Sequence, residues 1–214
     1  MKIGIIGAGD VGSTLGKAWA KRGHNVVFGV RNIQSPKVKK LLNSADSNIH
    51  VDKIHEAVHF GEVIVLAVPW EAAQETIRSV DDISGKIIID PSNPIKSDLK
   101  GVVVPSFTSA AEEISKLAKG ARVVKAFNAI GAKTLNNLQF GSHKADAFIC
   151  GDDLSAKSEV KKLAMEIGFN VVDAGPLSNA RLLENLALLW IELAFRQRMG
   201  PNIAFKLLTR EVGT

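Results

Sequence analysis

The sequence predicts an α/β fold, with a doubly wound, mainly parallel sheet and a small C-terminal helical region. Short apolar runs alternate with helical patterns from the start of the chain to about residue 173. This alternation is typical of parallel strands joined by right-handed helical crossovers. Beyond residue 173 the pattern changes to one long apolar helix. We therefore expect an α/β domain at 1–173 and a helical region at 174–214.

The first strand, Ile3–Ile6, ends in a glycine-rich turn. A helical pattern follows this turn as far as Ala20, and Val26–Phe28 begins a second strand. A GxGxxG turn between a strand and a helix is typical of a Rossmann-type site, where a dinucleotide pyrophosphate lies on helix N–H groups. The alternative is a turn that only packs the helix on the sheet. The residues expected to bind the cofactor are Gly7, Ala8, Gly9, Asp10, Val11 and Gly12.

The residues after the second strand favour NADP over NAD. NAD sites usually carry an acidic residue about twenty residues past the glycines, whereas this chain has no acid between Asp10 and Asp46. Arg31 can pair with a 2′-phosphate through its planar guanidinium, and Asn32 and Ser35 can donate further hydrogen bonds. The alternative is a solvated basic loop.

The next segments continue the alternation, with helices expected at 35–45, 52–60 and 71–79 and strands at 49–51, 62–68 and 86–90. Glu62–Val68 is a near-continuous apolar run, as expected for a central strand covered on both faces. Ligands of open α/β sheets lie at the carboxyl ends of such strands. We therefore expect Ala67, Val68 and Pro69 to contact the ribose or nicotinamide. Trp70 either stacks there or packs in the core.

Two prolines fix a loop at Pro91–Pro94, because neither proline fits a helix interior. Asn93 in this loop either hydrogen-bonds the nicotinamide or is an ordinary turn residue. A helix is expected at 109–118, ended by Gly120, and a strand at 122–127 leads into the segment Asn128–Ala132. A strand at 147–150, a helix at 156–167 and a strand at 170–173 complete the α/β domain.

The helical region begins after a break at 174–178 that contains glycine and proline. Ser178 is the expected N-cap of a helix running to about Met199. Between Arg181 and Arg196 this helix is apolar nearly all round, so it must be covered on several sides. Either the α/β domain or a second subunit covers it, and we expect a homodimer. Gly200-Pro201 ends the helix, and a last short helix is expected at 203–209.

Composition excludes several classes of function. The net charge of +5 comes from scattered side chains without basic runs interleaved with aromatics, so we expect no nucleic-acid partner. Cys150 is the only cysteine, which excludes an internal disulfide and a thiolate zinc site and suits a reducing cytoplasm. The apolar stretch Leu182–Phe195 is interrupted by polar residues and is too short to span a bilayer, so we expect no membrane partner. Because the N-terminus enters a strand directly, we expect no signal peptide.

Other catalytic constellations are missing from the sequence. His55 and His59 lie four residues apart without a third ligand, so we expect no metal site. The chain has no tyrosine and no grouping of serine, histidine and aspartate that predicts a nucleophile. We therefore expect no catalytic side chain.

Several blocks of the chain resemble the NADPH-dependent F420 reductase family, which includes the archaeal coenzyme F420:NADP oxidoreductases. These blocks are GIIGAGDVGSTLGKAWAKRGHNVVFGVRN, AVPWE, VVKAFNAIGA, CGDD and DAGPLSNARLLENLALLW. The pattern VKAFN-x-I-x-A is also similar to the cytosolic NADPH domain of the STEAP ferric reductases. The resemblance covers nearly the whole chain in order.

The resemblance implies a role for particular residues. It places Ala8–Val11 at the pyrophosphate, Arg31 at the 2′-phosphate, and Val68 and Ala132 beside the nicotinamide, with Ile203 near a deazaflavin. Archaeal members tend to have a different version of Phe127–Gly131, which contains a histidine and ends in proline. The second cofactor is therefore left open between coenzyme F420 and a related flavin, FMN or FAD.

These features predict an oxidoreductase that transfers a hydride between NADP(H) and coenzyme F420 or a related flavin. Because the two cofactors carry the chemistry, the protein has to stack their rings between small apolar walls. The further cofactor contacts are expected at Lys125, Asn128, Ala129, Ile130 and Ala132. The alternatives are a STEAP-like flavin or ferric reductase, a reductase of a small carbonyl or imine, and a dinucleotide-sensing module without turnover. Lys125 is the nearest proton donor for the carbonyl or imine reaction, and otherwise a cofactor or structural contact.

Overall fold

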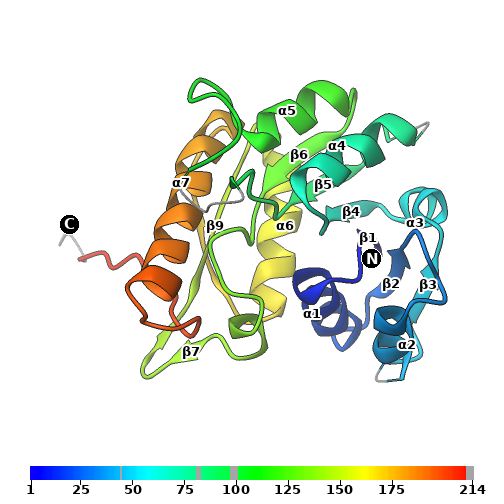
Figure 1. Cartoon of the computed structure of the whole chain (residues 1–214), viewed down its shortest axis with the longest axis horizontal. Helices are drawn as coiled ribbons and strands as arrows, with labels where there is room; N and C mark the ends of the chain where they lie inside the picture. The colour runs from blue at the N-terminus through cyan, green and yellow to red at the C-terminus, as the bar shows by residue number, and fades with distance from the viewer. Residues whose placement is uncertain (44, 81–82, 97–100, 211–214) are drawn as a thin grey trace.

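The computed structural model describes residues 1–43, 45–80, 83–96 and 101–210 and shows an eight-stranded sheet between two layers of helices (Figure 1). The strand order is β10-β9-β6-β5-β4-β1-β2-β3, and all neighbours are parallel except β6 and β9. This confirms the predicted doubly wound, mainly parallel sheet. The strands are β1 (Lys2–Ile6), β2 (Asn25–Gly29), β3 (Ile49–Asp52), β4 (Val63–Leu66), β5 (Ile87–Asp90), β6 (Arg122–Lys125), β9 (Asp146–Gly151) and β10 (Asn170–Asp173).

Three of the helices, α2, α5 and α6, begin at a side chain that caps them. Ser35, Ser109 and Asp153 each accept a backbone N–H three residues further along the chain, as N-cap side chains do. Of the helix predicted at 35–45, Ser44 lies outside the described residues. The helices are α1 (Asp10–Ala20), α2 (Pro36–Leu42), α3 (Ile54–Phe60), α4 (Trp70–Ser79), α5 (Ala110–Leu117), α6 (Leu154–Glu166) and α7 (Ala180–Ile191).

Successive residues of each strand face opposite layers. Ile5 and Val65 pack in the layer that contains α1 and α6, whereas Ile6 and Ile64 pack in the layer that contains α3, α4, α5 and α7. Because both faces of the sheet are covered, the strands read as continuous apolar runs instead of alternating ones.

Phe127 turns the chain sharply at the carboxyl end of β6. Its φ of 63° lies in the left-handed region that residues with a side chain rarely adopt. Its ring packs against Trp19 and Phe169, with centroids 5.9 and 5.7 Å away. These buried contacts hold the residue in its unfavourable conformation and direct Asn128–Ala132 away from the sheet.

Between β6 and β9 the chain forms short elements that were not predicted. They are the 3₁₀ turn η1 (Thr134–Asn136) and the hairpin of β7 (Gln139–Phe140) and β8 (His143–Lys144). Two-residue strands leave too little alternation for a pattern to be detected. This connection contains no long crossover helix, and β9 accordingly pairs antiparallel to β6.

The start of the C-terminal region differs from the prediction. A 3₁₀ turn, η2 (Leu177–Asn179), precedes α7, so the N-cap is Asn179 and the prediction of Ser178 was wrong. After Ile191 the helix continues as the π-helical turn η3 (Glu192–Arg196). The predicted division at 173/174 stays a prediction.

The helix predicted at 203–209 was also wrong, because these residues are extended. The Asp146 backbone N–H donates to the Phe205 carbonyl at 3.2 Å, and the Asp146 carboxylate accepts from Lys206 Nζ at 2.7 Å and from the Leu207 N–H at 2.6 Å. Because a helix of seven residues is marginal by itself, these contacts with β9 decide the conformation. Among the described residues, no helix has the length and apolar character needed to cross a bilayer.

Candidate functional site

Two glycines shape the turn after β1. Gly7 has a φ of 101°, and a Cβ there would lie 2.5 Å from the Ala67 carbonyl oxygen. A Cβ at Gly12 would lie 2.6 Å from the Gly7 carbonyl oxygen. Both distances are too short for real atoms, so glycine at both positions is what allows the turn and α1 to approach β4 closely.

The amino end of α1 is open. Its N-cap, Gly9, has no side chain to accept a first-turn N–H, and a Cβ at this position would meet no atom within 4 Å. The N–H groups of a first helical turn carry partial positive charge and bind phosphates. The segment Ala8–Gly12, which includes Asp10 and Val11, therefore fits the pyrophosphate of a dinucleotide.

A pocket of about 520 Å³ opens from this turn along the carboxyl ends of β1, β2 and β4. Its residues come from separate segments that each follow a strand, which is the usual place of a ligand in an open parallel sheet. The structure thus brings much of the predicted site together. The predicted residues that line the pocket are Gly7, Ala8, Gly9, Arg31, Asn32, Ser35, Ala67, Val68 and Pro69.

The rim of this pocket after β2 is basic. Arg31 and Lys37 line it together with Asn32 and Ser35, and none of the lining residues is acidic. A carboxylate that would bind a ribose 2′-hydroxyl is thus missing from the pocket, whereas two cations are available for a 2′-phosphate. The donor set fits NADP better than NAD.

Five lining residues that belong to helices were not among the predicted contacts. Ala72 and Thr76 lie one turn apart on α4, Ile54 begins α3, and Lys37 and Val38 lie on α2. The rule that ligands lie at strand ends does not point to helices. The spacing of four residues between Ala72 and Thr76 was the available signal, because it puts both on one face of α4.

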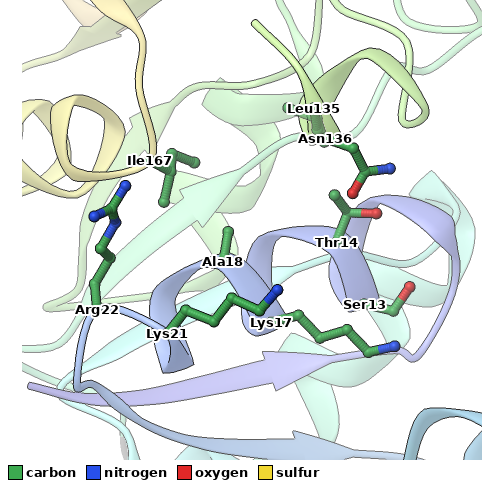
Figure 2. A pocket seen from close by; sticks show the side chains of 9 residues that line it. All are labelled: Ser13, Thr14, Lys17, Ala18, Lys21, Arg22, Leu135, Asn136 and Ile167. Atoms are coloured by element: carbon green, nitrogen blue, oxygen red, sulfur yellow. The ribbon is translucent and has the colours of Figure 1, made fainter. Parts of the chain in front are cut away.

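A second pocket, of about 610 Å³, lies between α1, η1 and the end of α6 (Figure 2). None of the predicted site residues lines it. Figure 2 shows Thr14 of α1 beside Asn136 of η1, with Arg22 reaching toward Ile167 at the other end. Lys17, Lys21 and Arg22 make this pocket basic as well.

Asn93 and Asn128 bind each other. Asn93 Nδ2 donates to the Asn128 carbonyl at 2.8 Å, and Asn128 Nδ2 donates to Asn93 Oδ1 at 3.0 Å. Asn128 Nδ2 also donates to the Leu183 carbonyl at 2.8 Å. The pair joins the loops after β5 and β6 to α7, and neither residue lines the 520 Å³ pocket.

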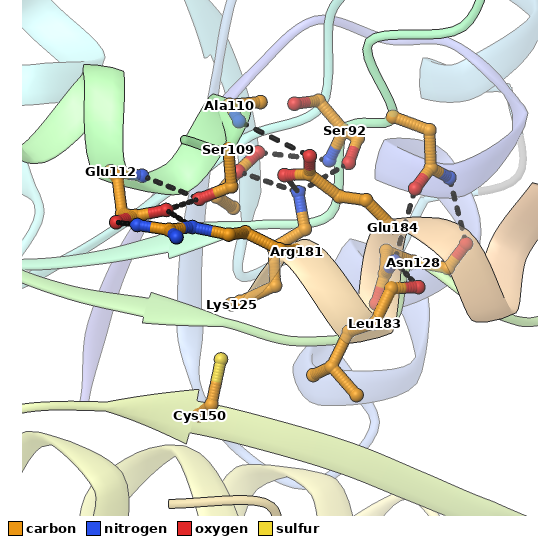
Figure 3. Close-up of polar contacts among 12 residues, drawn as sticks. Ser92, Ser109, Ala110, Glu112, Lys125, Asn128, Cys150, Arg181, Leu183 and Glu184 are labelled. Atoms are coloured by element: carbon orange, nitrogen blue, oxygen red, sulfur yellow. Dashed lines mark hydrogen bonds and ion pairs between the residues drawn. The ribbon is translucent and has the colours of Figure 1, made fainter. Parts of the chain in front are cut away.

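Lys125 is fully buried at the end of β6 and is the centre of a charge cluster (Figure 3). Its ammonium donates to Asp90 Oδ2 at 2.9 Å, to the Ser92 carbonyl at 2.6 Å and to Glu184 Oε1 at 2.9 Å. An ammonium has three hydrogens, so these three acceptors leave none for a ligand. Of the alternatives for Lys125, the geometry supports a structural contact and neither a cofactor contact nor a proton donor.

The charges in this cluster shift each other's pKa values. Burial alone lowers the pKa of Lys125, but the nearby carboxylates of Asp90 and Glu184 outweigh it and the pKa is raised. Burial raises the pKa of Glu184, and the charge of Lys125 opposes this change. Lys125 therefore stays charged in the folded protein, and two carboxylates share its single positive charge.

Glu112 holds α7 to α5 through a second ion pair. Arg181 Nε and Nη2 donate to the two carboxylate oxygens of Glu112 at 2.8 and 2.6 Å, a bidentate arrangement. The hydrogen bond from Arg181 lowers the pKa of Glu112. Glu184 adds to this attachment, because its Oε2 accepts the Ala110 N–H at the start of α5 at 3.2 Å.

Trp190 joins the segment Asn128–Ala132 to the C-terminal tail. A Cβ at Gly131 would lie 2.9 Å from Trp190 Cζ2, and Trp190 Nε1 donates to the Ile203 carbonyl at 2.9 Å. One tryptophan thus contacts both the turn and Ile203. The predicted residues of this group lie outside the 520 Å³ pocket, and they are Ala129, Ile130, Ala132 and Ile203.

Other side chains left open by the sequence have structural roles. Trp70 is buried in the layer with α3, α4 and α5, which supports core packing over stacking on a ligand. Burial raises the pKa of the Cys150 thiol to about 12, so this cysteine is unreactive at neutral pH. In the part of the chain that the structure describes, no group of three or more metal-ligating side chains occurs.

Comparisons with known proteins agree with this geometry. Residues 2–94 match the family described as NADP oxidoreductase coenzyme F420-dependent. The F420-dependent NADP reductase of Methanothermobacter marburgensis is 33% identical over 213 residues, which cover 93% of this chain and 95% of that protein. A crystal structure described as that of an F420-dependent NADP-reductase from Arthrobacter sp. FB24 has a TM-score of 0.84 and 26% identity, covering 98% of this chain and 100% of that one.

The similarity to STEAP proteins is of a different kind. Metalloreductase STEAP3 of Rattus norvegicus is 35% identical over 189 residues, but these cover 87% of this chain and 36% of STEAP3. This chain therefore spans about a third of that relative, whereas it spans nearly all of the Methanothermobacter reductase. The family predicted from the motifs is confirmed: the chain belongs to the coenzyme F420-dependent NADP oxidoreductases.

Proposed function

We propose that the protein binds NADP(H) along the 520 Å³ pocket. The pyrophosphate lies on the segment Gly7–Gly12, the 2′-phosphate lies at Arg31, Asn32 and Ser35, and the nicotinamide end lies toward Ala67–Pro69. The observation that carries this proposal is one cavity that runs from an uncapped helix amino end to a basic rim without a carboxylate.

We further propose that the protein transfers a hydride between NADP(H) and coenzyme F420 or a related flavin. When bound, the two ring systems supply the redox chemistry. The chain's own contribution is to orient the rings, and the small side chains of Ala129 and Ala132 with Ile130 suit a close approach. Family membership supports this function, and the reaction needs no proton from the buried Lys125.

Parallel turnover assays test the function. We expect purified protein to oxidise NADPH with coenzyme F420 and to oxidise NADH far more slowly. FMN, FAD, a ferric chelate and a small cyclic imine are offered in the same assay. Turnover with the ferric chelate or the imine alone favours one of the alternative reductases, and NADPH binding without turnover of any acceptor favours a sensing module.

A homodimer built on α7 is part of the proposal. The spacing of Leu182, Leu186, Leu189 and Leu193 puts these side chains on one stripe of α7 and η3. Leu182 is 64% and Leu189 47% exposed and Leu186 and Leu193 are half-buried, whereas the adjoining side of α7 packs on the sheet layer through Leu183. Exposed apolar side chains gathered on one face of a helix mark a surface that another protein can cover. The unpaired Cys150 supports a cytoplasmic location.

A further inference from the structure

The pocket between α1, η1 and the end of α6 is basic (Figure 2). Lys17, Lys21 and Arg22 line it from α1 and the turn that follows, and none of its nine lining residues is acidic. Lys21 and Arg22 are exposed, and among the described residues neither side chain pairs with a carboxylate. We name this cavity the α1 basic pocket.

Polar groups and an apolar floor complete the α1 basic pocket. Ser13, Thr14 and Asn136 line the end near the start of α1, and Ala18, Leu135 and Ile167 are its apolar residues. Glu166 precedes the lining residue Ile167 in sequence, and its Oε2 pairs with His24 Nε2 at 2.7 Å. Hydroxyls, an amide and several cations around an apolar floor suit a flexible anionic group with a carbon chain.

The α1 basic pocket is joined to the segment Asn128–Ala132. The Gly131 carbonyl accepts the N–H groups of Thr134 and Leu135, at 2.9 and 3.3 Å, so η1 follows directly on that turn. One wall of the pocket is therefore continuous with the residues proposed to face the acceptor ring. The other wall is α1, whose amino end is proposed to hold the NADP(H) pyrophosphate.

We propose that the α1 basic pocket binds the anionic, phosphate-bearing tail of the electron acceptor. This inference rests on the proposed function. Coenzyme F420 and FMN each have an apolar ring at one end and a ribityl phosphate chain at the other, and in F420 this chain continues into carboxylates. Such an acceptor needs small apolar walls for the ring and cations for the tail. In this structure the segment Asn128–Ala132 offers the walls, and η1 joins it to the cations of the α1 basic pocket. Lys21 and Arg22 thereby select phosphorylated acceptors over the bare ring with its ribityl chain.

The test compares acceptors with and without the tail. Coenzyme F420 is paired with the same deazaflavin ending at the ribityl chain, and FMN is paired with riboflavin. In the double variant Lys21→Gln, Arg22→Gln, we expect kcat/KM for F420 to fall at least about tenfold, since each lost contact to a phosphate costs roughly a charged hydrogen bond. The fall should come mainly from KM, and kcat/KM for each tailless acceptor should stay at its wild-type value.

A matched control removes the same charge elsewhere. Lys161→Gln, Lys162→Gln changes two exposed lysines on α6 that do not line the α1 basic pocket. We expect this control to keep the wild-type preference for F420 over the tailless deazaflavin. Raising the ionic strength should lower kcat/KM for F420 more than for the tailless form in wild type, and should have less effect in the double variant.

Three results would overturn the inference. One is an unchanged preference for F420 over the tailless form in the double variant, and another is an equal loss for both acceptors. The third is a variant that melts at a lower temperature but has unchanged kinetics. Lys21 and Arg22 would then only stabilise the carboxyl end of α1 through the helix dipole. Failure of the proposed function looks different, because then wild-type protein turns over neither acceptor. In that case equal affinities of wild type for the two deazaflavins, measured by their fluorescence with NADP⁺ present, still overturn the pocket assignment.

Discussion

Arg31 is exposed at the rim of the 520 Å³ pocket, where no lining residue carries a negative charge. Arg31→Glu would place a carboxylate beside the proposed 2′-phosphate. Losing a charged hydrogen bond costs about 1.5–3 kcal/mol, or roughly ten- to a hundredfold in affinity. We expect the KM for NADPH to rise by that factor while the KM for NADH changes little, measured by steady-state kinetics with both cofactors.

The control for Arg31 is a charge reversal of the same size nearby. Lys39 is exposed on α2 and does not line the pocket, so Lys39→Glu should affect NADPH far less. If Arg31→Glu raises both KM values equally, Arg31 does not bind the phosphate.

Ser92 carries a buried hydroxyl, and its Oγ has no hydrogen-bond partner among the described residues. Its backbone carbonyl and N–H are used by Lys125 and Asp90 and stay in place when the side chain is shortened. Removing an unsatisfied buried hydroxyl relieves a desolvation penalty of about 1–3 kcal/mol, offset in part by lost packing. We expect Ser92→Ala to raise the urea midpoint of unfolding, and a lower midpoint would mean that the hydroxyl has a partner.

At the scale of elements, Lys125 connects β5, β6 and α7. Lys125→Met keeps an unbranched side chain, one atom shorter, but leaves Asp90 and Glu184 buried without a counter-charge, which costs about 3–5 kcal/mol. We expect a loss of that size in the free energy of unfolding measured with urea at pH 7. Glu184→Gln keeps a hydrogen-bonding group and should cost less.

The same variants separate a structural Lys125 from a cofactor contact. Glu184→Gln and wild type should bind NADPH with equal affinity, because the ammonium lies outside the 520 Å³ pocket. A Lys125 variant that keeps the wild-type free energy of unfolding but binds NADPH more weakly would contradict the structural role.

The Arg181–Glu112 pair predicts a dependence on acid pH. The hydrogen bond from Arg181 lowers the pKa of Glu112 below its ordinary value of 4.5. A carboxyl with a lowered pKa stabilises the fold above pH 4.5, and this stabilisation is lost as the pH falls through the lowered pKa. We expect Glu112→Gln to be less stable than wild type at pH 7, with the difference shrinking below pH 4.5 in urea titrations at each pH. A constant difference at all pH values would show that the loss is one of packing.

The elements show where reasoning from sequence succeeds. Ile5 and Ile6 face opposite layers, so the buried strands were visible as apolar runs, and the glycine turn fixed the start of α1. Long-range partners were not visible in this way. Lys125 and Glu184 are 59 residues apart, and the extended tail depends on Asp146, about 60 residues before it. No local pattern encodes such pairs. The first pair counts against the cofactor contact expected at Lys125, and the second replaces the helix expected at 203–209.

In the molecule as a whole, α7 was expected to be covered on several sides, and the structure accounts for part of that coverage. Leu183, Ala187 and Trp190 are buried against the rest of the chain, whereas Leu182 and Leu189 are largely exposed. The sequence predicted an apolar helix without saying which side the sheet layer covers. Only the packing of Leu183 against that layer separates the internal face from the external one.

The exposed face of α7 predicts the oligomeric state, because apolar patches on a surface mark sites where another protein binds. Leu182→Glu, Leu189→Glu puts two charges on the stripe. Burying them in an interface would cost several kcal/mol per unpaired charge, whereas on a free surface they cost little. We expect wild type to be a dimer and this variant a monomer by light scattering after gel filtration. Leu207→Glu, Leu208→Glu changes two other exposed leucines that lie off the stripe and should leave the dimer intact. A wild-type monomer, or a dimer that survives both pairs of substitutions, would show that α7 does not form the interface.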